Sequence, residues 1–201
     1  MLVARWNAII IPRVWIICQV HKLAKKIPGY QQTLVYVLDE AWIMGGDTVK
    51  AIGTFVERYP SKDWPRIYMY GDAAGESPNS ANGISDWATL QTDARMKPYR
   101  VSYHYPKANP PIVDRIVSTN AKLCNADGDI GILIHPRCKH LLTDLQQTRW
   151  VEGKRQLDHG SRQKEIFLTH VSDGLGYFVY REWPVSAKFG IRKIGEGTTV
   201  R

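Results

Sequence analysis

The first forty residues alternate between short apolar runs and turns. Residues 2–6, 14–20 and 33–42 are rich in β-branched and aromatic residues, which favour strands, and Pro12 separates the first two runs. Three consecutive strands with short links predict an antiparallel meander. The apolar stretch near the N-terminus is interrupted at Pro12 and falls short of the roughly 20 residues that a membrane span needs, so we interpret it as two strands.

A helix and a buried strand follow the meander. From Asp47 to Tyr59 the apolar residues recur at helical spacing, with Asp47 or Thr48 as the N-cap. The run "RIYMYGDAAG" then predicts a buried strand that ends in Asp72 and a turn of small residues. Because a strand, a helix and a second strand typically build a parallel pair, we expect this strand to pair in parallel with residues 33–42.

The second half of the chain alternates helices with strands. Ser85 is expected to cap a helix, residues 99–105 alternate with the period of a strand, and "GILIH" predicts another short strand. Three further helices are expected, and the first of them carries an apolar stripe of Ile112, Ile116 and Leu123. The whole pattern predicts an α/β fold, with a mixed sheet (an antiparallel three-strand meander plus parallel strands) flanked by helices, in a single domain over residues 1–201.

Charge and cysteine content narrow the class of partner and compartment. The 27 Lys and Arg exceed the 19 Asp and Glu, and the net charge of +8 favours a polyanionic partner such as nucleic acid. Three widely spaced cysteines imply no disulfide framework, which fits a reducing compartment such as the cytoplasm.

The last predicted helix combines buried-looking and ionisable positions. In "THVSDGLGYFVYREWP", His170, Asp173 and Tyr177 fall on one helical stripe, and a second stripe is apolar. A carboxylate taken out of water costs several kcal/mol unless a cation or hydrogen bonds compensate. The helix therefore predicts a partner for Asp173 elsewhere in the chain.

Asp72 is the second carboxylate that a buried element places. The carboxyl ends of strands are where α/β sheets build their sites, and the small residues around Asp72 leave space for a ligand. If Asp72 and Asp173 meet, they repel each other unless a divalent cation lies between them, and hard oxygen ligands suit Mg²⁺ or Mn²⁺. A two-metal site of this kind can cleave a phosphodiester. The alternatives are a turn aspartate at Asp72 and a solvated helix position at Asp173.

The segments "YGDAAG", "NPPIVDRIVSTNAKLCNADGDIGILIHPRCKHLLTDLQQTRW" and "THVSDGLGYFVYREWP", in this order and spacing, resemble the C-terminal nuclease domain of tailed-bacteriophage terminase large subunits. The resemblance extends from about residue 33 onward. It implies a ribonuclease H-like fold in which acidic residues bind two ions, Mg²⁺ or Mn²⁺, and cut concatemeric double-stranded DNA in the host cytoplasm during genome packaging. It also implies that Asp72 and Asp173 are metal ligands, that His170 belongs to the site, and that the small subunit, the portal and a terminase ATPase domain are partners.

The chain departs from the family pattern at its first strand. The family normally ends that strand with an aspartate, and here Arg5 stands in its place. We expect Glu40 to supply the missing ligand; Asp39 is the alternative, since successive strand side chains point to opposite faces. If neither does, the chain is a catalytically impaired DNA-binding domain of the same fold. No phosphate-binding loop of the G-x-x-x-x-G-K-S/T type occurs, so the packaging ATPase is not expected in this chain.

Other residues and one other hypothesis have weaker support in the sequence. His135, Cys138 and His140 lie close together but lack the paired spacing of a structural zinc site. A nucleotide-binding α/β protein remains a third hypothesis, which the absence of G-x-G-x-x-G disfavours. Arg115 is expected to pair on its own helix, outside the catalytic set. Four basic residues are predicted to contact DNA phosphates beside the metal site, with a solvated charge run as the alternative: Lys154, Arg155, Arg162 and Lys164.

Overall fold

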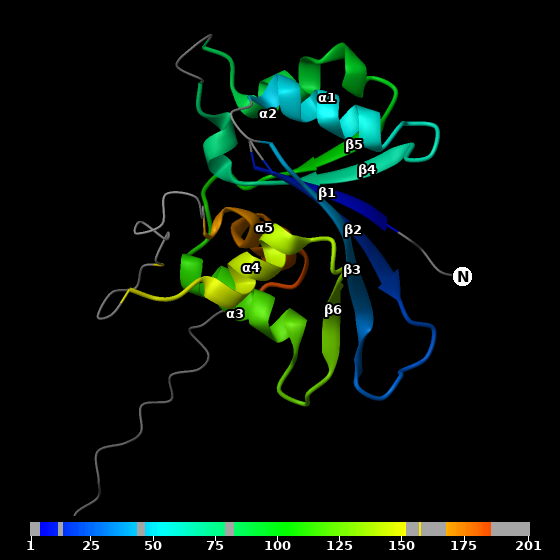
Figure 1. Ribbon diagram of the computed structural model, residues 1–201, viewed down its shortest axis with the longest axis vertical. Coiled ribbons are helices and arrows are strands. Elements are labelled where there is room, and N and C mark those ends of the chain that lie inside the picture. The colour runs from blue at the N-terminus through cyan, green and yellow to red at the C-terminus, as the bar shows by residue number, and fades with distance from the viewer. Residues whose placement is uncertain are drawn as a thin grey trace, which may run out of the picture.

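A six-stranded mixed sheet forms the centre of the computed structural model, with strand order β5-β4-β1-β2-β3-β6 (Figure 1). The structure describes residues 5–11, 14–43, 47–78, 83–151, 157 and 168–185, without the side chains of 5–11. The strands are β1 Arg5–Ile11, β2 Val14–Lys22, β3 Tyr30–Trp42, β4 Arg66–Tyr70, β5 Arg100–His104 and β6 Ile130–Ile134.

The pairing confirms the predicted mixed sheet. Strands β1, β2 and β3 form an antiparallel meander, while β4 lies parallel to β1, β5 parallel to β4, and β6 parallel to β3. This is a ribonuclease H-like sheet with β6 added beside β3. Two expectations were wrong in detail. The first strand extends to Ile11 rather than ending at residue 6, and β4 pairs with β1 instead of with β3.

Helices cover both faces of the sheet (Figure 1). The helices α1 Thr48–Arg58 and α2 Asp86–Thr92 lie on one face, and α3 Ile112–Leu123, α4 Lys139–Gln147 and α5 His170–Glu182 lie on the other. Two short 3-10 turns, η1 Ala73–Glu76 and η2 Ala94–Met96, follow β4 and α2. Asp47 and Ser85 cap α1 and α2 as predicted, by accepting from the amides of Lys50 and Ala88. None of the described helices is long and apolar enough to cross a membrane.

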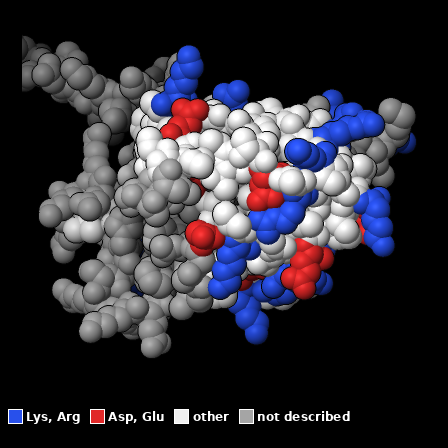
Figure 2. Space-filling view, turned by 90° about the horizontal axis from the view of Figure 1, so that it is seen from above, with Lys and Arg blue, Asp and Glu red and all other residues white. Residues whose placement is uncertain are grey.

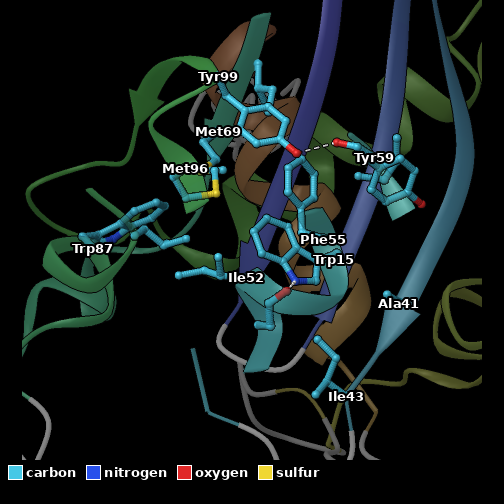
Figure 3. Close-up of a cluster of buried hydrophobic side chains, with 14 residues drawn as sticks. Trp15, Ala41, Ile43, Ile52, Phe55, Tyr59, Met69, Trp87, Met96 and Tyr99 are labelled. Atoms are coloured by element: carbon cyan, nitrogen blue, oxygen red, sulfur yellow. Dashed lines mark hydrogen bonds between the residues drawn. The ribbon is translucent and has the colours of Figure 1, made fainter. Parts of the chain in front are cut away.

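The alternation along β2 divides the interior into two cores. Trp15 and Ile17 face the first core, under α1 and α2, whereas Ile16 and Cys18 face the second core, under α4 and α5. In the first core, Trp15 stacks on Phe55 with 4.7 Å between ring centroids and donates from Nε1 to the carbonyl oxygen of Ala51 at 2.9 Å (Figure 3). A strand buried on both faces reads as a continuous apolar run, which explains the sequence of β2.

Helix α3 buries a face different from the one its apolar residues predicted. Ile112, expected in the buried stripe, is 37% exposed. The buried positions are polar and lie at helical spacing, namely Arg115, Ser118, Thr119 and Lys122. Arg115, Ser118 and Lys122 form hydrogen bonds with other segments, and Thr119 donates to the carbonyl oxygen of Arg115 on its own helix. Burial therefore follows hydrogen bonding here rather than hydropathy.

Lys122 is a buried cation on that face. Its Nζ donates to the carbonyl oxygen of Thr33 at 2.6 Å and to Oε1 of Gln31 at 3.2 Å, and it lies 4.3 Å above the Trp183 ring. Burial lowers the pKa of Lys122 to about 8. The charged form is therefore less favoured in the folded protein than in the unfolded chain.

We expect the stability contributed by Lys122 to rise with pH. Between a folded pKa of about 8 and the unfolded value of about 10.4, the unfolded chain binds more protons, so the free energy of unfolding increases with pH. Urea unfolding should show wild type gaining about 2 kcal/mol relative to Lys122→Met between pH 7 and pH 10. A difference between the two proteins that does not change with pH would contradict this.

Candidate metal centre at the carboxyl end of β4

Asp72 lies directly beyond β4, in a loop that its neighbours hold tightly. Its Oδ1 accepts a hydrogen bond from the amide of Gly75 at 3.2 Å, and Trp87 Nε1 donates to its carbonyl oxygen at 3.0 Å. A side chain at Gly75 would place a Cβ 2.7 Å from Trp87 Nε1, so this close approach requires glycine. Asn109 Oδ1 accepts from the Ala73 amide at 2.7 Å on the other side. Asp72 is therefore both a turn cap and a strand-end carboxylate.

Helix α5 carries Asp173 between two buried surfaces, as the sequence predicted. Its apolar stripe, which includes Leu175, Phe178 and Val179, packs into the second core against the sheet. Asp173 and Tyr177 face α3, whereas His170, the first residue of the same stripe, is exposed. The Asp173 side chain is 28% exposed, so it keeps a partial route to solvent.

The partner that the structure gives Asp173 is Arg115 of α3. Arg115 Nη1 donates to Asp173 Oδ1 at 2.8 Å, its side chain is only 6% exposed, and its guanidinium lies 4.3 Å from the centre of the Tyr177 ring. Sequence reasoning had placed Arg115 outside the site. The available signal was the spacing of polar residues in α3, where Arg115 begins the series that continues through Ser118, Thr119 and Lys122.

Burial dominates the electrostatics of the two carboxylates. Desolvation raises the pKa of Asp72 and of Asp173, and the nearby Arg115 charge opposes the rise at both. Asp173 in turn raises the pKa of Asp72. The same surroundings raise the pKa of Tyr177 to about 12, first through burial, with both carboxylates adding to the effect. Asp72, Asp173, Tyr177 and Arg115 thus form one electrostatic cluster, although the two aspartates are 101 positions apart in the sequence.

Glu40 faces the same side of the sheet as α5, but α4 binds its carboxylate. Oε1 accepts from the His140 amide at 2.7 Å and Oε2 from the Leu141 amide at 2.9 Å. Asp39 points to the opposite face and accepts a hydrogen bond from the Tyr59 hydroxyl. The two carboxylates thus point to opposite faces of the sheet, as strand alternation predicts, and Glu40 lies on the face that α4 covers.

The backbone register of β1 corrects the position assigned to Arg5. Ile9 pairs with Tyr70 of the parallel strand β4, so Ile11 lies level with Asp72, whereas Arg5 is at the opposite end of β1. Arg5 therefore does not occupy the strand end where the family aspartate is expected. The β1 positions nearest the site are apolar, Ile9 to Ile11.

Asp72 and Asp173 offer oxygen atoms of the kind that a divalent cation binds. Two carboxylates are few ligands for such a cation. Carboxylate oxygens are the ligands that Mg²⁺ and Mn²⁺ prefer. Within the described part of the chain, no three or more His, Cys, Asp or Glu side chains converge as a ready metal cluster. A cation at the two aspartates would have to compete with Arg115 for Asp173, and water would complete its coordination.

The four predicted DNA contacts, Lys154, Arg155, Arg162 and Lys164, lie outside the described residues. On the face of the molecule in Figure 2, Lys and Arg side chains are interspersed with Asp and Glu rather than gathered in one basic patch. Most of the excess positive charge of the sequence is in segments whose side chains are not described. The site of polyanion contact therefore stays a prediction.

The His135, Cys138 and His140 group has other roles. Cys138 is fully buried in the second core, and the His140 ring pairs with Glu40 and stacks on Trp42. His135 Nδ1 accepts from the amide of Arg137 at 3.1 Å. Each of the three residues therefore makes its own contact within the fold.

Comparison with known proteins gives one structural match. No family model matches the chain, and no curated protein matches it. Among solved structures, the chain is similar to the nuclease domain of g2p, the large terminase of bacteriophage SPP1, solved with bound Mn. The two are 12% identical, with a TM-score of 0.46, and the match covers 89% of this chain and 85% of that chain. Similarity at this level assigns no function to individual residues.

Proposed function

We propose that this chain is the metal-dependent DNA endonuclease domain of a phage DNA-packaging terminase large subunit, which cuts concatemeric viral DNA. The observation that carries the proposal is that Asp72, at the end of β4, interacts electrostatically with Asp173, on α5, and with the buried Arg115 that pairs with Asp173. Of the three motifs that resemble terminases, the first contains Asp72 and the third contains Asp173. Double-stranded DNA is the substrate, and the small subunit, the portal and an ATPase domain in the host cytoplasm are the partners that follow.

Each residue of the site has a distinct part in this proposal. Asp72 and Asp173 hold the divalent cation, Mg²⁺ or Mn²⁺, which when bound activates water and stabilises the leaving oxygen of a phosphodiester. Arg115 opposes the rise that burial causes in the pKa of Asp173, and its hydrogen bond orients the carboxylate. His170 lies one turn before Asp173 on the exposed start of α5, where an imidazole can accept or return a proton. Glu40 would join the ligands only by releasing α4, so a second ion would depend on that release.

A catalytically impaired DNA-binding domain is the second candidate. It is favoured by the apolar end of β1, which offers no third carboxylate level with Asp72, and by the buried Arg115 beside Asp173. In this case the domain binds DNA phosphates without cutting them, and binding weakens steeply with salt.

Nicking of supercoiled plasmid separates the two candidates. The purified domain is incubated with plasmid in Mn²⁺ and in EDTA, and DNA binding is measured in parallel over a range of salt. Cutting that requires Mn²⁺ supports the endonuclease. Salt-sensitive binding without cutting supports the impaired domain, and a chain that does neither contradicts both.

The register of β1 predicts where a lost ligand can be restored. Ile11→Asp adds a carboxylate level with Asp72, so we expect nicking in Mn²⁺ to rise by about 10-fold or more, within the range that a single metal-site interaction can change. Arg5→Asp also adds a carboxylate to β1, but at the far end of the strand, and although it changes the charge by two units instead of one it should not raise the rate. A gain in Arg5→Asp alone would mean that β1 is shifted in register.

A further inference from the structure

Helix α5 begins without a cap of its own. Thr169, at its N-cap position, has a left-handed backbone with φ 78°, and its side chain makes no capping hydrogen bond. Among the described residues other than glycine, it alone has a positive φ. The first amides of a helix have no partner within the helix, and at a buried helix end they must find one elsewhere.

Asp144 of α4 supplies these partners. Its side chain lies in the interior, with the residue 2% exposed. Oδ2 accepts from the amides of Val171 at 3.0 Å and Ser172 at 2.8 Å, and Oδ1 accepts from the amide of Thr169 and from the hydroxyl of Thr148 at 2.7 Å. The negative charge also lies at the positive end of the α5 dipole, which stabilises it there.

The amides that Asp144 binds surround the proposed site residues. They belong to Thr169, Val171 and Ser172, so they flank His170 and end directly before Asp173. The amide of Asp173 donates to the Thr169 carbonyl oxygen at 2.8 Å, which closes the first turn of the helix. The place of the Asp173 carboxylate therefore depends on the turn that Asp144 holds.

A carboxylate also binds the first amides of α4, the helix that carries Asp144. Glu40, on β3, binds the first amides of α4, and Asp144, on α4, binds the first amides of α5. One carboxylate thus joins the start of α4 to β3, and the other joins the start of α5 to α4. The central sheet sets the position of α4, and α4 sets the first turn of α5.

We propose that Asp144 is a positioning residue for the metal centre. It fixes the first turn of α5, so that Asp173 and His170 keep their places, and it acts through the backbone without contacting the cation or DNA. The part that concerns metal rests on the proposed function; the part that concerns the helix start does not.

The test uses Asp144→Ala, Asp144→Asn and a matched control. Asp47→Ala removes the cap of α1, on the other face of the sheet, and so removes a helix cap far from the site. Amide hydrogen exchange of Val171 and Ser172 reports the α5 turn, and titration with Mn²⁺ alone, under conditions where every variant is folded, reports the site. We expect Asp144→Ala to lose protection at both amides and about 10- to 100-fold in Mn²⁺ affinity, as supporting residues around metal sites do. Asp144→Asn, which keeps one accepting oxygen, should lose less, and Asp47→Ala should match wild type in both measurements.

The outcomes separate this inference from the proposed function. Protected amides in Asp144→Ala, or an equal loss of Mn²⁺ affinity in Asp47→Ala, would overturn the positioning role. If wild type binds no Mn²⁺ while the two amides lose protection only in the Asp144 variants, the metal proposal fails and the role of Asp144 in placing Asp173 stands.

Discussion

Replacing Asp173 by leucine should lower the free energy of unfolding by about 3–5 kcal/mol, the cost of leaving a buried charge without its partner. The stranded group is Arg115, whose side chain is 6% exposed. Its Nη1 loses the carboxylate at 2.8 Å, and its Nε already has no hydrogen-bond partner among the described residues. Urea unfolding followed by circular dichroism measures the difference.

Removing the other partner should cost less. In Arg115→Met the unpaired group is Asp173, and its side chain is 28% exposed and can recover water. We expect a loss of about 1–3 kcal/mol, in the range for leaving one polar group unsatisfied. The double variant Arg115→Met/Asp173→Leu removes both charges and should recover most of the stability lost in Asp173→Leu, because an apolar pair of similar volume is often as stable as a buried ion pair. A larger loss in Arg115→Met than in Asp173→Leu would contradict the burial asymmetry on which this expectation rests.

The sequence predicted that Asp173 has a partner but did not identify that partner as Arg115. The stripe of α5 required a partner for Asp173, and the structure supplies one, but the identity of the partner depended on how α3 is rotated. Hydropathy placed Ile112 inside and gave Arg115 no special role, whereas the structure buries Arg115 and exposes Ile112. Periodicity predicts which residues share a helix face; it does not predict that a polar face will be buried when the opposing helix offers a carboxylate and a tyrosine ring.

In the sheet, the sequence likewise predicted local features but not contacts between distant segments. Strand positions in β2 to β6 followed from apolar runs and turn residues, and the antiparallel meander followed from short links. The neighbour of β4 did not, because the β3–α1–β4 connection crosses β2 and β1 and places β4 on the far side of β1. Glu40 was likewise assigned to the correct face by strand alternation, while its contact with the α4 amides depends on a helix a hundred residues later.

Replacing Asp72 tests catalysis more directly than replacing Asp173, because, among the described residues, Asp72 forms no direct ion pair that the substitution would break. We expect Asp72→Asn to reduce Mn²⁺-dependent nicking on the order of 1,000-fold. Charge stabilisation by a bound metal is worth several kcal/mol in the transition state, and each 1.36 kcal/mol is a factor of about ten in rate. Asparagine keeps the volume and one oxygen that can accept from the Gly75 amide, so the loop after β4 should hold its shape.

The choice of Asp72 over Asp173 decides what a loss of cutting means. An inactive Asp173 variant could be inactive only because Arg115 is stranded, so its loss of activity does not identify a ligand. Asp72→Asn should unfold at nearly the same urea concentration as wild type while failing to cut. The matched control is Asp93→Asn, in which the altered carboxylate caps η2 and pairs with Arg95, outside the candidate site. If Asp72→Asn nicks DNA at the wild-type rate, Asp72 is not part of the metal centre. If Asp72→Asn and Asp93→Asn lose nicking activity equally, both losses result from damage to the fold.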